Sequence, residues 1–145
     1  MEGEAERQVM DQLLKPREKR SPVVLVVDDN PAIRNVISWS LRLGGYEPIE
    51  AINGREAAAW MEQAAREQRY PAVILLDLAM PDMNGETFLQ WLQSTWSADY
   101  PTPSIIIVTA GYVDERMLNA HVKQVVTKPF HMRDLLEAVR TWVIV

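Results

Sequence analysis

The segment AVILLDLAMPDMNG, residues 72–85, joins an unbroken aliphatic run to a carboxylate and then to a turn-forming loop. A short run without polar residues is typical of a strand buried on both faces of a parallel sheet. Open α/β sheets place their functional groups at the carboxyl ends of such strands. We therefore expect Asp77 to lie at the functional edge of a sheet.

Three other hydrophobic runs end in polar groups of complementary kinds. They are residues 23–27 before Asp28-Asp29, residues 105–108 before Thr109, and residues 125–126, which lead through Thr127 to Lys128-Pro129. Right-handed βαβ crossovers bring the ends of parallel strands to one edge. The sequence therefore predicts one pocket with three carboxylates, one hydroxyl and one ammonium group.

Strands and helices alternate five times after residue 22. A further, more exposed strand is predicted at 47–51, and helices are predicted at about 31–43, 55–68, 86–93, 113–120 and 132–142. Asn30-Pro31 offers an N-cap and a first-turn proline for the first of these helices. The predicted fold class is α/β, with a doubly wound parallel sheet between two helical layers. We expect each of the five tryptophans to be partly buried on its own helix face.

Composition limits what this pocket belongs to. The chain has 145 residues, 48% of them hydrophobic, which suits one compact domain. Fifteen basic and twenty acidic side chains give a net charge of −5, which disfavours direct binding of nucleic acid or an anionic membrane. The absence of cysteine excludes disulfides, thiolate zinc sites and cysteine nucleophiles. No apolar run approaches the ~20 residues that span a bilayer, and the first residues lack a signal-peptide pattern, so we expect a soluble cytoplasmic protein.

Residues 1–21 form a polar N-terminal extension, and residues 22–145 form the domain. Four apolar residues of the extension recur at helical spacing and predict a short amphipathic helix over about residues 4–14: Val9, Met10, Leu13 and Leu14. A helix of this length is marginal alone in water. Two interpretations stay open, a solvated tail or a helix that docks on its own domain or on a partner.

The predicted pocket has a charge conflict. Three carboxylates within a few ångströms repel one another by on the order of kcal/mol even at an effective dielectric near 20. A bound divalent cation resolves this conflict, and oxygen-only ligands select a hard ion such as Mg²⁺, for which Mn²⁺ or Ca²⁺ could substitute. We expect Asp29, Asp77 and a backbone carbonyl just after Asp77 to be ligands, with Asp28 acting partly through water.

The other two groups suit phosphate. The ammonium group of Lys128 and the hydroxyl of Thr109 can each bind a phosphoryl oxygen. A carboxylate beside a cation, a hydroxyl and an ammonium is arranged to take up a phosphoryl group as an acyl phosphate. Asp77 is the predicted nucleophile.

These motifs together resemble the receiver domain of two-component response regulators. The resemblance covers residues 22–144 and is carried by Asp28-Asp29, by LDLAMPDMNG around Asp77, by Thr109-Ala110 and by Lys128-Pro129-Phe130. It implies a flavodoxin-like (βα)₅ fold in three layers with sheet order 2-1-3-4-5.

The resemblance also implies a role for each site residue. Asp77 would accept phosphate from a phosphohistidine on a sensor histidine kinase or histidine phosphotransfer protein, in a Mg²⁺-dependent reaction that the receiver itself promotes. The implied metal site comprises the acidic pair Asp28 and Asp29, Asp77 and the Ala79 carbonyl. Thr109 would be the switch hydroxyl, Lys128 the phosphate-binding lysine, and the Lys128-Pro129 bond would be cis. Beyond this self-promoted phosphorylation and dephosphorylation, no enzyme activity is expected.

Two positions depart from the family pattern. Val125 stands where the family usually has a tyrosine or phenylalanine whose ring moves with the threonine, and His121-Val122 stands where it favours Gly-Ala. A valine has no ring to move, so we expect a smaller or different rearrangement on phosphorylation. A degenerate receiver that acts as a constitutive interaction module is the alternative hypothesis.

Other functions with related chemistry fit less well. A Mg²⁺-dependent aspartyl-phosphate phosphatase of the haloacid dehalogenase type needs a second aspartate two residues after the first, where this chain has Ala79. A flavodoxin needs a phosphate-binding loop after the first strand, where Asp28-Asp29 would repel phosphate. We expect a stand-alone receiver that signals to a downstream protein by contact, through the last two helices and the strand between them. Phosphorylation-dependent homodimerisation stays open.

Overall fold

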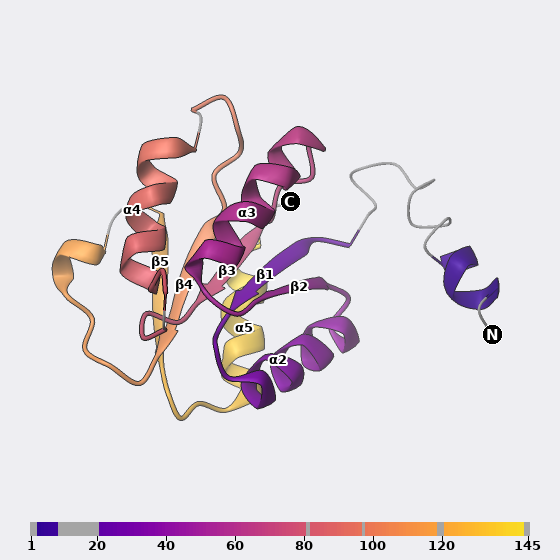
Figure 1. The fold of residues 1–145 in the computed structure, drawn as a ribbon. Coiled ribbons are helices and arrows are strands. Elements are labelled where there is room, and N and C mark those ends of the chain that lie inside the picture. The colour runs from indigo at the N-terminus through magenta and orange to yellow at the C-terminus, as the bar shows by residue number, and fades with distance from the viewer. Residues whose placement is uncertain (1–2, 9–20, 81, 97, 119–120, 144–145) are drawn as a thin grey trace.

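The computed structural model describes residues 3–8, 21–80, 82–96, 98–118 and 121–143. Its centre is a parallel sheet of five strands in the order β2-β1-β3-β4-β5 (Figure 1). The strands are β1 (Val23–Val27), β2 (Glu47–Ala51), β3 (Val73–Leu76), β4 (Ser104–Thr109) and β5 (Val122–Thr127). This order confirms the predicted flavodoxin-like α/β fold.

Helices cover both faces of the sheet. They are α2 (Pro31–Leu43), α3 (Gly54–Arg66), α4 (Gly85–Thr95) and α5 (Met132–Trp142). Helices α2 and α5 pack together on one face, and α3 and α4 pack together on the other (Figure 1). The three predicted layers are therefore present.

The strands β1, β3 and β4 are buried along their whole length. Successive side chains point to opposite faces, so Leu25 packs toward α3 and α4 while Val24 and Val26 pack toward α2 and α5. This explains why these strands are continuous hydrophobic runs and not alternating ones. The same burial holds the ends of β1, β3 and β4 in fixed positions.

Three helices begin with an asparagine cap. The side chain of Asn30 accepts hydrogen bonds from the backbone N–H groups of Ala32 and Ile33, at 3.0 and 3.2 Å. Asn53 and Asn84 accept equivalent bonds in the first turns of α3 and α4, at 2.8 and 2.9 Å. These caps satisfy N–H groups that the first turn of a helix leaves unpaired. They determine where the chain turns from the sheet edge into each helix.

The predicted helix at 113–120 is wrong over the residues that the structure describes there, 113–118. Only one 3-10 turn forms, Glu115–Met117. The Asp114 side chain accepts from the backbone N–H of Arg116 at 2.9 Å and also binds its guanidinium group. These local bonds, the side-chain bond foremost, lower the pKa of Asp114 to about 2. They compete with a regular helix, since short polar side chains that bond to nearby backbone favour turns.

Four tryptophans are partly buried, as predicted: Trp60, Trp91, Trp96 and Trp142. The prediction is wrong for Trp39, which is 63% exposed. On α2 the buried positions belong to Ile37, Ser38, Ser40 and Leu41, so Trp39 lies on the opposite, solvent-facing side. Val36 and Leu43, also exposed, lie on the same side at helical spacing.

Residues 3–8 of the extension are helical and exposed. The apolar residues that predict an amphipathic helix, at 9–14, lie outside the described residues. The structure therefore tests neither the solvated nor the docked interpretation of the extension. Within the described part of the chain, no helix has the length and apolar composition needed to cross a membrane.

Candidate functional site

Three carboxylates converge at the carboxyl edge of the sheet, as predicted. Asp28 follows β1 and Asp77 follows β3, and they are only 3% and 6% exposed, whereas the neighbouring Asp29 is exposed. One carboxylate oxygen of each residue lies within 4.8 Å of the others. The backbone N–H of Asp77 donates to the Val27 carbonyl at 3.0 Å, which extends the ladder between β1 and β3 to the residue after β3. The sheet itself therefore brings the acidic groups together.

Lys128 reaches this cluster from the loop after β5. Its Nζ lies 2.6 Å from Asp28 Oδ2 and 3.4 Å from Asp77 Oδ2. Its backbone N–H donates to the Thr109 carbonyl at 3.0 Å, which fixes the start of the loop, and the Lys128-Pro129 bond is cis as expected. One ammonium group thus bridges carboxylates that come from two different strands.

Opposing effects act on the pKa of Lys128. Burial is the largest and lowers it, but the hydrogen bond and charge of Asp28, followed by the charge and hydrogen bond of Asp77, together outweigh burial. The pKa of Lys128 is therefore raised. The ammonium group keeps its charge at neutral pH, where it neutralises part of the acidic cluster.

Thr109 ends β4 and is 2% exposed. It pairs in register with Thr127 of β5, next to Lys128. Its hydroxyl oxygen accepts the backbone N–H of Gly111 at 3.3 Å and still carries a proton of its own to donate. The structure thus brings all the predicted side chains to one edge of the sheet.

The loop after β3 packs tightly against Asp77. The backbone N–H of Ala79 donates to Asp77 Oδ1 at 3.2 Å, and the N–H of Gly85 donates to the Leu78 carbonyl at 3.1 Å. A Cβ atom on Gly85 would overlap the Asp77 carbonyl oxygen and lie 2.7 Å from the Leu78 Cα. Only glycine allows this close approach of α4 to β3. The Ala79 carbonyl as a metal ligand stays a prediction.

The donor set fits a hard divalent cation. It consists of carboxylate oxygens, with no sulfur or imidazole group, and such a set suits Mg²⁺. Lys128 neutralises one of the three negative charges and hydrogen-bonds to Asp28 and Asp77. Among the described residues, no side chain or backbone group bonds to the Asp29 carboxylate. Asp29 is therefore available as a ligand at the exposed side of the cluster.

Sequence reasoning missed Arg34. This residue lies on the second turn of α2, and its Nη1 donates to the Asp28 carbonyl at 2.7 Å. Its Nε lies 3.4 Å from Glu50 on β2, and the side chain is only 14% exposed. A cation on a helix face that packs against the sheet, six residues after Asp28, is the signal that would have revealed it.

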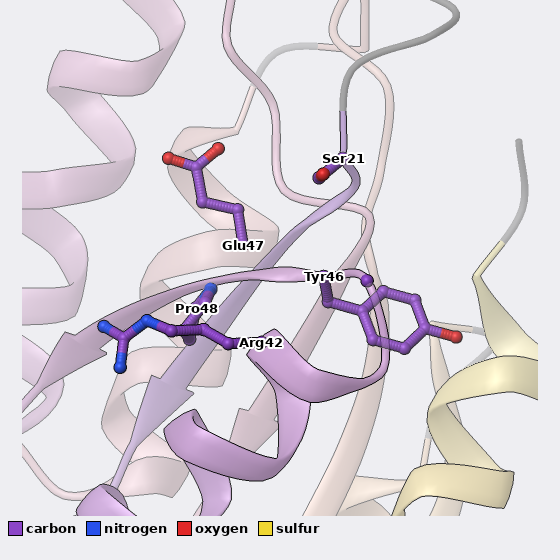
Figure 2. A pocket seen from close by; sticks show the side chains of 6 residues that line it. Ser21, Arg42, Tyr46, Glu47 and Pro48 are labelled. Atoms are coloured by element: carbon purple, nitrogen blue, oxygen red, sulfur yellow. The ribbon is translucent and has the colours of Figure 1, made fainter. Parts of the chain in front are cut away.

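A separate pocket of about 390 Å³ lies at the opposite end of the strands (Figure 2). Six residues line it: Ser21, Arg42, Gly45, Tyr46, Glu47 and Pro48. The side chains of Arg42 and Tyr46 point in opposite directions there (Figure 2). Glu47 is paired with Arg69. These polar groups do not converge, so the pocket has no arrangement for chemistry.

Comparisons with known proteins agree with the site. A family model described as the response regulator receiver domain matches residues 24–140. The DNA-binding dual master transcriptional regulator RpaA of Synechocystis sp. is 30% identical over 122 residues, which cover 82% of this chain and 48% of RpaA. The chain thus spans about half the length of the curated relatives it matches.

Solved structures give the same result. The signal receiver domain of a putative Luxo repressor protein from Vibrio parahaemolyticus is 28% identical, with a TM-score of 0.72 over 85% of this chain and 90% of that one. The response regulator TrrA of Thermotoga maritima, solved in complex with Mg(2+)-BeF, is 28% identical, with a TM-score of 0.65 over 83% of this chain and 98% of that one. With matching sequence, fold and acidic edge, the chain belongs to the response regulator receiver domain family and is a receiver domain of two-component signal transduction.

Proposed function

We propose that this receiver accepts a phosphoryl group on Asp77 from the phosphohistidine of a sensor histidine kinase or a histidine phosphotransfer protein. The observation that carries the proposal is the contact of one ammonium group, that of Lys128, with both Asp28 and Asp77 beside the exposed Asp29. In this arrangement Asp77 lies beside both a positive charge and the acidic pair that is proposed to bind the metal. A carboxylate so placed can attack phosphorus while its surroundings neutralise the phosphoryl oxygens.

In the proposed step, a carboxylate oxygen of Asp77 forms a bond to phosphorus as the bond from phosphorus to the histidine nitrogen breaks. The electron pair of the broken bond stays on the imidazole ring of the donor. Lys128 and Thr109 bind phosphoryl oxygens, through the ammonium group and the hydroxyl respectively. In decay, a water oxygen forms a bond to phosphorus as the bond from phosphorus to the Asp77 oxygen breaks, which releases inorganic phosphate and regenerates the carboxylate.

Asp29, Asp77 and the Ala79 carbonyl would hold Mg²⁺, with Asp28 acting partly through water. A bound Mg²⁺ supplies positive charge that relieves repulsion among the carboxylates and neutralises the transferred group. Mn²⁺ or Ca²⁺ would substitute on the same oxygen ligands. The TrrA structure, described as a complex with Mg(2+)-BeF, supports this assignment.

The receiver is proposed to promote only its own phosphorylation and dephosphorylation. Ala79 stands where a phosphatase of related mechanism needs a second carboxylate to assist turnover. We therefore expect one phosphoryl group per chain and slow decay, without repeated hydrolysis of a separate substrate.

Helix α2 is the proposed docking surface for the phosphodonor. Its exposed apolar side chains, Val36, Trp39 and Leu43, are 53%, 63% and 70% exposed. The helix starts at Pro31, directly after the acidic pair, so a partner bound along it would lie beside Asp77. Exposed apolar side chains grouped in this way mark protein–protein contacts more often than isolated ones do.

The signal is proposed to leave by protein contact on the β4–β5 side, toward a downstream target. RpaA is described as a DNA-binding transcriptional regulator, and it and other curated relatives are about twice as long as the aligned region, so the comparisons do not support the stand-alone expectation. They favour a transcriptional output, reached through protein contact because the receiver itself has a net charge of −5.

The test uses acetyl phosphate and Mg²⁺ with intact-mass detection. We expect one base-labile phosphoryl group on the wild-type chain and none on Asp77→Asn. The matched control is Asp82→Asn, which removes an exposed carboxylate from the same loop and should be labelled like the wild type. Equal labelling of Asp77→Asn would contradict the assignment of the acceptor.

A further inference from the structure

Asp29 has no contact that would aim its carboxylate. It is exposed, and no group in the described part of the chain hydrogen-bonds to its side chain. Its oxygen nevertheless lies within 4.8 Å of oxygens of Asp28 and Asp77. The direction of the Asp29 side chain is therefore set by its backbone. The orientation of the peptide group between Asp28 and Asp29 is the first factor that sets this direction.

Arg34 holds that peptide. Its Nη1 donates to the Asp28 carbonyl oxygen at 2.7 Å, which is a short, charge-assisted hydrogen bond. The Asp28 N–H donates to Ala51 at 3.1 Å, and Asp28 Oδ1 accepts from the Asn30 N–H at 2.9 Å. These two bonds hold the backbone N–H of Asp28 and that of Asn30. Among the described residues, the guanidinium group alone bonds to the Asp28 carbonyl that lies between them.

The guanidinium group is itself held in place. Its Nε lies 3.4 Å from Glu50 Oε1, near enough for an ion pair but outside hydrogen-bond geometry, so this buried N–H is left without a hydrogen-bond partner. An unpartnered buried donor is destabilising. The net stabilisation therefore depends on the guanidinium group contacting the Asp28 carbonyl and Glu50 at the same time. The planar fork of arginine permits both contacts, and a lysine does not.

We propose that Arg34 is a positioning residue for the cation site. By fixing the Asp28 carbonyl, it orients the peptide that carries Asp29, and so it aims the Asp29 carboxylate at the cation. This inference rests on the proposed function, because it concerns the same Mg²⁺ site. Residues that orient metal ligands in this way typically change metal affinity by 10–100-fold when they are mutated.

The test is a Mg²⁺ titration by calorimetry. We expect Arg34→Gln to weaken Mg²⁺ binding about 10-fold, near the low end of that range because Arg34 acts through the backbone. Arg34→Lys should restore part of the affinity, since an ammonium group can reach one of the two oxygens. The control Arg42→Gln changes an exposed arginine of the same helix and should bind Mg²⁺ like the wild type.

A double-mutant cycle separates positioning from general destabilisation. If Arg34 acts through Asp29, then Arg34→Gln should weaken Mg²⁺ binding far less in an Asp29→Asn background than in the wild type. In the metal-free protein, Arg34→Gln should also shift the backbone amide resonances of Asp29 and Asn30. Those of α5 should not shift.

Two results would overturn the inference. The first is an Arg34→Gln variant that melts at a lower temperature yet binds Mg²⁺ as tightly as the wild type, which would make Arg34 merely structural. The second is a double-mutant cycle in which the losses of Mg²⁺ affinity from Arg34→Gln and Asp29→Asn are additive. A wild-type chain without Mg²⁺ affinity would instead overturn the proposed function, and this inference with it.

Discussion

The acidic ends of β1 and β3 lie in the most buried part of the sheet, whereas residues 110–118, which follow β4, are largely exposed and have little regular structure. Asp28 and Asp77 follow strands that are wholly buried and paired on both sides. Residues 110–118 contain one 3-10 turn, and Tyr112 is 86% exposed there. The two regions share one sheet edge but differ in packing.

The difference corresponds to two requirements of a signalling domain. Phosphoryl transfer needs charged groups held within tenths of an ångström, which close packing provides. A readout needs an element of low local stability that can change its arrangement. The departures from the family pattern, Val125 and His121-Val122, lie in β5 and directly before it, next to the second region and not on β1 or β3. The chemistry and the readout of this receiver should therefore respond separately to mutation.

The largest expected effect comes from Lys128, whose ammonium group bridges the two buried carboxylates, Asp28 and Asp77. We expect Lys128→Ala to slow labelling by acetyl phosphate about 100-fold, as removal of one donor to a charged transition state typically does. The affinity for Mg²⁺ should stay the same or rise, because the ammonium group competes with the cation for Asp28 and Asp77. Intact-mass kinetics and calorimetry measure the two quantities.

The control for this variant is Lys123→Ala, which removes an exposed lysine from β5. It should leave both quantities unchanged. Markedly weaker Mg²⁺ binding by Lys128→Ala would contradict the placement of the ammonium group as a competitor of the cation.

The buried region was the more predictable one. The aliphatic runs, the asparagine caps and the polar residue at the end of each strand are local signals, and parallel topology then brings the ends together. This reasoning located Asp28, Asp29, Asp77, Thr109 and Lys128 at one edge, as the structure shows. It did not find Arg34, because a single arginine on a helix is usually a solvated charge, and its burial depends on Glu50 from another strand.

The exposed region was less predictable for a physical reason. None of residues 113–118 is fully buried, so burial provides little free energy to stabilise a helix there. The bonds between Asp114 and Arg116 are local and favour a turn instead. The predicted partial burial of Trp39 was wrong for a related reason, since hydrophobicity alone does not show which of two helix faces packs against the sheet.

An intermediate effect is expected at the docking surface on α2. The donor is a phosphorylated histidine kinase that labels the wild-type chain. Trp39→Ala should slow transfer from this kinase about 10-fold, since a large aromatic side chain at a contact typically contributes more than 1 kcal/mol. Labelling by acetyl phosphate should not change, because Trp39 is 63% exposed and acetyl phosphate needs no docking surface. The ratio of the two labelling rates is the measurement.

Tyr112→Ala is the matched control, because it removes an exposed aromatic side chain from the β4–β5 side. It should alter neither rate. A Trp39→Ala variant that loses both activities equally would contradict the docking assignment, since it would indicate damage to the site itself.

The smallest effect on chemistry is expected at Val125, and it tests the separation of the two regions most directly. Val125 of β5 packs against the hydrophobic core, and it takes no part in the hydrogen bonds or ion pairs described for the carboxylates. Val125→Phe should therefore change the acetyl phosphate labelling rate by less than about twofold. The effect of Val125→Phe on the phosphorylation-dependent rearrangement should be larger.

In the wild type, hydrogen exchange should change on addition of fluoroberyllate, a stand-in for the phosphoryl group, mainly at residues 110–118. With a ring at position 125 the change should extend into β5, because the Thr109 hydroxyl would then have a bulky neighbour to displace. If β5 of the wild type already responds as strongly, the rearrangement needs no ring, and the readout is coupled to the site by the backbone pairing of β4 with β5 alone.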